Sequence, residues 1–101
     1  MAYVSYVLEI AVPAVASEIG TMAADTTCNI YIVNRGTVSG NVSLYIGAAA
    51  GAADCVLFTF PIKPSATFIL TDVYIKSGDK VFIDSPADFT VRVEGKEEAT
   101  V

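Results

Sequence analysis

The sequence contains no histidine and no tryptophan, and only 17% of its residues are charged, against about 25% in an average globular protein. Without histidine the chain lacks the commonest general base, the usual catalytic triads and the commonest transition-metal ligand. No GxGxxG, Walker A or HExxH motif is present. We therefore predict no catalytic residue, no metal ligand and no cofactor, and we expect that the protein is not an enzyme.

Carboxylates could still support glycoside hydrolysis or calcium binding in a chain without histidine. The candidates are Asp72, Asp79, Asp84 and Asp88. Asp79 follows Gly78 and Asp88 follows Pro86, both in turn-forming contexts where aspartate is favoured for local backbone hydrogen bonds. No DxDxDG spacing is present, so we favour structural roles for these aspartates.

Positive charge is also scarce. Six basic residues are scattered along a chain of net charge −5. Nucleic-acid binding depends on neutralising phosphates with Lys and Arg, so neither nucleic acid nor an anionic membrane is an expected partner. The apolar stretch from Val7 to Val15 is interrupted by Glu9 and Pro13, which fits neither a signal peptide nor a membrane span. We expect the protein to stay in the compartment where it is made.

The chain has two cysteines, Cys28 and Cys55. One disulfide bond is conceivable. In a chain without an export signal, the favoured interpretation is two reduced cysteines that act as small hydrophobic residues within strands.

Hydrophobic residues are abundant, at 53% of a 101-residue chain whose length fits one domain. Short runs rich in Val, Ile, Tyr, Phe and Thr recur between Gly, Pro, Asn, Asp and Ser, which is typical of a sandwich or barrel. We predict an all-β fold: an antiparallel β-sandwich of about seven to eight short strands with an N-terminal arm. Residues 1–12 are the arm or first strand, 13–95 the sandwich, and 96–101 a solvated tail. The apolar surplus favours self-association.

Alternation with a period of two assigns the inward-facing positions. It predicts a hairpin whose two strands are joined through residues 34–41, and a flexible loop at residues 47–53. It also predicts that Val56, Phe58 and Phe60 share one face, and that a bend or bulge at Asp72 shifts the register. The side chains expected to face inward are Cys28, Ile30, Ile32, Val42, Leu44, Ile46, Phe68, Leu70, Val73, Ile75, Val81, Ile83, Phe89, Val91 and Val93.

The N-terminal segment is more apolar than an exposed terminus should be. Its candidate interface residues are Tyr3, Val4, Tyr6, Val7, Leu8 and Ile10. The segment is either the first strand of the same sandwich or an arm that pairs with the sheet edge of a neighbouring subunit. We favour the first strand, and keep the arm as the alternative.

Outward-facing tyrosines raise the question of sugar binding, since carbohydrate sites stack sugars on exposed rings. The relevant residues are Tyr3, Tyr6, Tyr31, Tyr45 and Tyr74. Tyrosine on a sheet surface also forms ordinary cross-strand and interface contacts, and tryptophan is absent. We therefore favour an interface over a lectin-like site.

The order of features over residues 26–95 resembles the small β-sandwich virion proteins of tailed bacteriophages. A strand ending in an Asn-containing turn (30–36) leads to a Val-rich strand (42–46) and an Ala/Gly-rich loop. A segment around Pro64 then precedes the run 73–83, and the closing strand ends in Val93-Glu94-Gly95.

The resemblance implies a virion structural protein. The first expectation is a capsid decoration, or cement, protein on the capsid surface, assembled in the host cytoplasm, with the major capsid protein as its partner. By analogy it would also associate with itself, as a trimer. A neck or tail component is an alternative, and so is a small module that binds carbohydrate or a cell-surface ligand.

Overall fold

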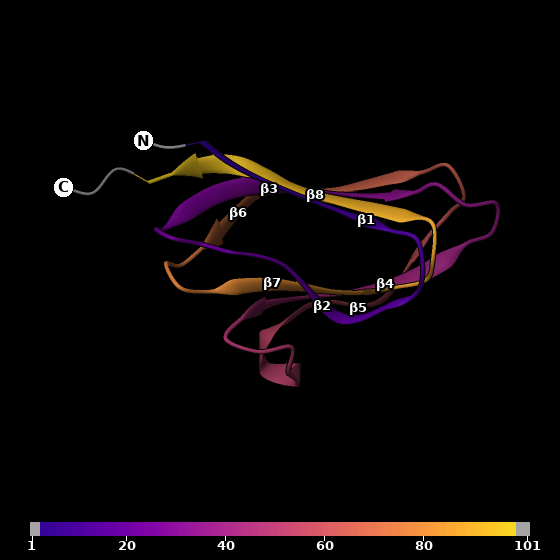
Figure 1. The fold of residues 1–101 in the computed structure, drawn as a ribbon, viewed down its shortest axis with the longest axis horizontal. Helices are drawn as coiled ribbons and strands as arrows, with labels where there is room; N and C mark the ends of the chain where they lie inside the picture. The colour runs from indigo at the N-terminus through magenta and orange to yellow at the C-terminus, as the bar shows by residue number, and fades with distance from the viewer. Residues whose placement is uncertain (1–2, 99–101) are drawn as a thin grey trace.

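The computed structural model describes residues 3–98, which form eight β-strands and a short 3-10 helix (Figure 1). The elements are β1 (Tyr3–Ile10), β2 (Ala14–Thr21), β3 (Thr26–Asn34), β4 (Gly40–Gly47), η1 (Ala52–Asp54), β5 (Cys55–Ile62), β6 (Thr67–Ile75), β7 (Lys80–Ser85) and β8 (Phe89–Glu97). They build two four-stranded antiparallel sheets that face each other. The predicted all-β sandwich of seven to eight strands is confirmed.

The strands pair in a nested order. The first sheet has the order β1-β8-β3-β6 and the second sheet the order β2-β7-β4-β5. Thus β1 pairs with β8, β2 with β7, β3 with β6 and β4 with β5, as if one long hairpin had been rolled up. This double-sheet arrangement of eight strands is a jelly roll.

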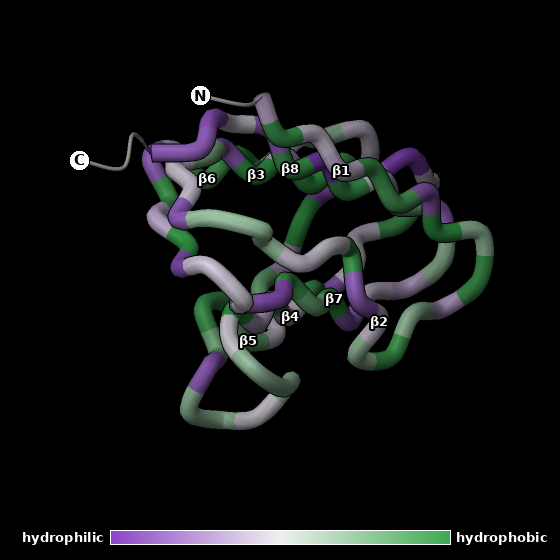
Figure 2. The backbone as a smooth tube through the Cα atoms, turned by 60° about the vertical axis from the view of Figure 1, so that its left-hand side comes forward, coloured by the Kyte–Doolittle hydropathy of each residue, from purple (hydrophilic) through white to green (hydrophobic). Residues whose placement is uncertain are grey.

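The core lies between the two sheets. Hydrophobic residues recur along the strands of both sheets (Figure 2). Buried and less buried positions alternate along strands such as β3 and β7, as the pleat of a strand requires. Every position predicted to face inward from β3, β4, β6, β7 and β8 is buried in this core or packs against it. The largest fully buried side chains include Phe89, Met22, Ile30, Ile32 and Leu44.

The predicted hairpin through residues 34–41 is wrong. β3 belongs to the first sheet and β4 to the second, so this connection crosses between the layers. The buried side chain of Asn34 organises it, because its Nδ2 donates to the carbonyls of Val38 (2.9 Å) and Ile62 (3.0 Å) and its Oδ1 accepts from the Gly36 amide (2.9 Å). The Asn and Gly residues thus form a bridge between sheets.

Bulges explain which predictions of side-chain direction are correct and which are wrong. The bulge at Asp72 is confirmed: its φ is 55°, and the pairing of β6 with β3 shifts between Cys28 and Ile30. The expectation that Val56 and Phe58 share a face with Phe60 is wrong. The pairing of β5 with β4 shifts twice, so Phe60 packs against the core while Phe58 is 72% exposed.

The N-terminal segment is strand β1 of the sandwich. It pairs with β8 from Tyr3↔Lys96 to Ile10↔Phe89, so the first-strand alternative describes its position within the chain. β8 continues to Glu97, which places Lys96 and Glu97 in the sheet and not in the predicted solvated tail. Glu98 follows the strand and is exposed, and residues 99–101 of that tail lie outside the described residues.

Candidate functional site

The six residues predicted as an interface all lie on β1 but divide between its two faces. Four of them face the core: Val4, Tyr6, Leu8 and Ile10. Tyr3 and Val7 point outward, with 61% and 51% of their surfaces exposed. Alternation along one strand therefore leaves two of the six available to a partner on the outer face, while the other four attach β1 to the sandwich.

Tyr6 links the two sheets at the margin of the fold. Its hydroxyl donates a 2.8 Å hydrogen bond to the carbonyl of Thr21 on β2. Its ring lies directly over Gly20, where a Cβ would sit only 2.7 Å from the ring carbons. Of the five tyrosines considered for sugar binding, Tyr6 is turned toward the interior, so it is not part of an exposed platform.

Cross-strand rows cover the outer face of the first sheet. One row contains Val7, Arg92, Tyr31 and Ile69, taken from the four strands in spatial order. A second row contains Tyr3, Lys96, Thr27 and Tyr74. Each row thus combines apolar or aromatic side chains with one cation. Residues from the beginning, middle and end of the chain meet on this face.

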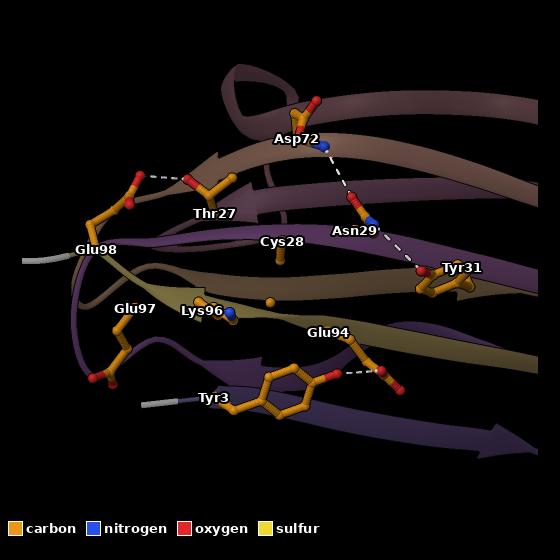
Figure 3. A pocket seen from close by; sticks show the side chains of 11 residues that line it. Tyr3, Thr27, Cys28, Asn29, Tyr31, Asp72, Glu94, Lys96, Glu97 and Glu98 are labelled. Atoms are coloured by element: carbon orange, nitrogen blue, oxygen red, sulfur yellow. Dashed lines mark hydrogen bonds between the residues drawn. The ribbon is translucent and has the colours of Figure 1, made fainter. Parts of the chain in front are cut away.

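A shallow hollow of about 450 Å³ lies on the same face, toward the ends of β1 and β8 (Figure 3). Tyr3 donates a 2.6 Å hydrogen bond to Glu94, which also forms a 2.5 Å ion pair with Arg92. The hydrogen bonds from Tyr3 and Arg92 lower the pKa of Glu94 below its ordinary value, and the bond to Glu94 raises the pKa of Tyr3. The polar groups of the hollow are therefore engaged largely with one another.

The other polar groups of the hollow also bond within the sheet. Asn29 donates to the Tyr31 hydroxyl at 3.4 Å and accepts from the backbone amide of Asp72 at 3.1 Å. Thr27 donates to Glu98 at 2.6 Å. The Asn29–Tyr31 bond lies within β3, the Asn29–Asp72 bond joins β3 to β6, and the Thr27–Glu98 bond joins β3 to the residue that follows β8. Side-chain contacts of this kind are typical of a sheet surface.

The aspartates have structural partners. Asp84 accepts from the backbone amide of Ala16 and from the Tyr45 hydroxyl, while Asp72 occupies the bulge in β6. Asp88, with φ of 65°, donates its amide to the carbonyl of Ile10 and closes the turn before β8. Within residues 3–98, no three His, Cys, Asp or Glu side chains are close enough to hold a metal ion.

The second sheet also exposes large apolar side chains. Phe58 and Val56 on β5 and Val15 on β2 are exposed, Val15 to 82%. Beside Phe58 lies a mostly apolar hollow of about 380 Å³, lined by Tyr45, Ala50, Ala52, Cys55 and Phe58. The sequence interpretation missed this surface because it placed Phe58 on the same face as Phe60, which packs against the core. The Ala/Gly-rich loop is the sequence feature that could have indicated this surface, because its small residues Ala50 and Ala52 line the hollow.

Both cysteines are free, as predicted. Cys28 lies in β3 and is buried in the core, and this burial raises the pKa of its thiol to about 11. Cys55 begins β5 in the other sheet and is partly exposed at the apolar hollow. The two thiols thus occupy different layers and different environments.

Comparisons with protein-family models, with curated proteins and with solved structures found no match. Among residues 3–98, no helix has the length and apolar character needed to cross a membrane.

Proposed function

We propose that this chain is a non-enzymatic structural subunit of a tailed-phage virion, a capsid decoration protein that packs against the major capsid protein lattice. The observation that carries the proposal is the exposure of large apolar side chains on the outer faces of both sheets. They are Tyr3, Val7, Ile69 and Tyr74 on the first sheet, and Val15, Val56 and Phe58 on the second. Exposed apolar surface of this kind marks contact with other macromolecules.

The fold is compatible with this role without proving it. Jelly rolls occur in viral capsid domains, and also in lectins and cupins, so it is the exposed apolar surface that supports a capsid role and not the topology. The faces of a sandwich are rigid and regular, and they can adhere to a repeating lattice without any chemical step. A subunit bound in this way stabilises the shell because it binds the assembled form only.

Charge supports a protein partner over nucleic acid. The chain has a net charge of −5, and the cations of the first outer face, Arg92 and Lys96, lie among carboxylates. Such a surface repels a phosphate backbone. It suits a contact in which apolar side chains form the centre and mixed charges form the rim.

The test uses shells assembled from the major capsid protein encoded in the same genome. The full chain is added, and the melting temperature of the shells is measured by calorimetry. We expect bound chain to raise that temperature. We also expect Phe58→Ser or Ile69→Ser to weaken binding, according to which face meets the shell. Val38→Ser is the matched control, because Val38 is a similarly exposed residue in a loop.

Three results would overturn the capsid assignment. The chain could fail to sediment with shells, or neither face variant could change its binding. It could also purify with tails, which would favour the neck or tail alternative. A carbohydrate-binding module is favoured by a different observation, the exposed Tyr3 beside a polar hollow, and specific binding on a glycan panel that is lost in Tyr3→Ala would establish it.

A further inference from the structure

The four edges of the two sheets differ in how they are protected. Strands β1 and β6 form the edges of the first sheet, and β2 and β5 form the edges of the second. An edge strand presents unpaired backbone N–H and C=O groups, which can pair with another chain unless bulges, prolines or charges prevent it. The pattern of protection therefore indicates which edge is available for assembly.

Three of the edges are interrupted. β2 has two register shifts and contains Ala16 at φ of 47°. β5 has two register shifts, contains Thr59 at φ of 46°, and carries Pro61, which has no N–H to donate. β6 carries the bulge at Asp72. Each of these irregularities twists the edge and breaks the row of groups that an added strand would need.

β1 has no such protection. Its eight residues pair with β8 in unbroken register, and none has a positive φ. The strand contains no proline and no basic residue, and Glu9 is its single charge. Its outward side chains Tyr3 and Val7 are large and exposed. A regular, nearly uncharged edge of this length is a ready template for pairing with another chain.

We propose that the free edge of β1 pairs antiparallel with β1 of a second copy of this chain, joining the two first sheets into one eight-stranded sheet. The contact is isologous, with a two-fold axis that passes through the centre of the paired strands. Residues opposite each other in an antiparallel pair lie on the same face. The axis must therefore pass at a residue, and Tyr6 and Val7 are the two positions nearest the middle of the strand.

Both registers are self-complementary in charge. With the axis at Val7, Glu9 lies opposite Ser5 of the second copy. With the axis at Tyr6, Glu9 lies opposite Tyr3 of the second copy. The only carboxylate of the strand thus avoids its own symmetry mate and faces a hydroxyl group in either case, so no like charges are placed opposite each other. This match favours a second copy of the chain as the occupant of the edge.

The pairing deepens the proposed function, because it names the surface through which subunits join, but it is tested without any shell. Self-association of the isolated chain decides the pairing, and binding to shells decides the capsid role. The two can fail independently. The resemblance to phage proteins implied a trimer, whereas a single open edge favours a two-fold pair.

The test is analytical ultracentrifugation of the full chain and of Val7→Glu. Val7 lies opposite Arg92 on β8, so the new carboxylate has an opposite charge beside it within its own sheet and the fold is retained. In the paired sheet, the two introduced carboxylates lie opposite or diagonal to each other across the axis. We expect the dimer dissociation constant to rise about tenfold or more.

Val15→Glu is the matched control, because it introduces the same charge at an exposed valine on the bulged edge β2. Circular dichroism confirms that both variants are folded. Hydrogen exchange supplies a second readout: we expect the amides of residues 3–10 to be protected in the dimer and about half of them to exchange faster in Val7→Glu. A wild-type monomer, a trimer, or a dimer weakened equally by both substitutions would overturn the proposal.

Discussion

Substitution of Gly20 by alanine tests how β1 is attached to the rest of the sandwich. The new Cβ would lie 2.7 Å from two carbons of the Tyr6 ring, which is 0.7 Å below the 3.4 Å at which ordinary contacts begin. Those carbons are near the base of the ring, so the whole side chain must move. That movement also pulls the Tyr6 hydroxyl from the carbonyl of Thr21, now 2.8 Å away.

Two opposing contributions set the change in the free energy of unfolding of Gly20→Ala. Overpacking of this kind costs about 1–3 kcal/mol. The loss of backbone freedom in the unfolded chain stabilises the folded protein by about 0.4–1 kcal/mol, because alanine has fewer unfolded conformations than glycine. We expect a net decrease of about 1–2 kcal/mol in the free energy of unfolding. For a domain of this size the melting temperature would fall by about 4–8 °C for each kcal/mol.

Urea denaturation followed by circular dichroism measures the change, with Gly51→Ala as the matched control. A Cβ at position 51 meets nothing within 4 Å, so only the unfolded-state term remains and the control should be neutral or slightly stabilised. If Gly20→Ala and Gly51→Ala differ by less than about 0.5 kcal/mol, the Tyr6 ring does not rest on Gly20 and the reasoning fails.

Three further outcomes are expected. Native protein at pH 8 should react with one equivalent of a thiol reagent, at Cys55, because burial and a pKa of about 11 protect Cys28. In denaturant, two equivalents should react. Reaction of two equivalents with the native protein would contradict the burial of Cys28. In Tyr3→Phe the pKa of Glu94, followed by carboxyl NMR, should rise, because its hydrogen-bond donor is lost. The stabilisation by this carboxylate, present above pH 4.5 and lost as the pH falls through its lowered pKa, should shrink, and an unchanged pKa would refute the contact. Asn34→Ala should cost about 2–4 kcal/mol in urea denaturation, since two carbonyls and one amide lose their partner, and a cost below about 1 kcal/mol would mean that water replaces the amide.

The strands themselves could be predicted from the sequence, because alternation records which side chains are buried. The inward positions of β3, β4, β7 and β8 follow this pattern, and the bulge at Asp72 was visible as a polar residue where the apolar period changed phase. Alternation does not record which sheet a strand joins. The connection through Asn34 was therefore taken for a hairpin, although it crosses between layers.

The outer surface was harder to predict for the same reason. Phe58 is apolar and follows the expected period, but the bulge around Thr59 turns it outward. The six interface candidates on β1 were identified as a block, whereas the pleat sends Tyr3 outward and Ile10 into the core. The protection of one edge relative to another is a property of pairing between distant segments, and it becomes visible only when the strand order is known.

The pairing of β1 with β8 determines how the domain responds to mechanical load. Tyr3 lies beside Lys96, so both ends of the described chain leave the sandwich at the same end (Figure 1). Force applied between these ends would open the β1–β8 ladder one residue pair at a time, like a zipper, from Tyr3 toward Ile10. Force transmitted through the outer faces would instead be shared among the strands of a whole sheet. We therefore expect a domain with this connectivity to resist force better when it is held by its faces than when it is held by its ends.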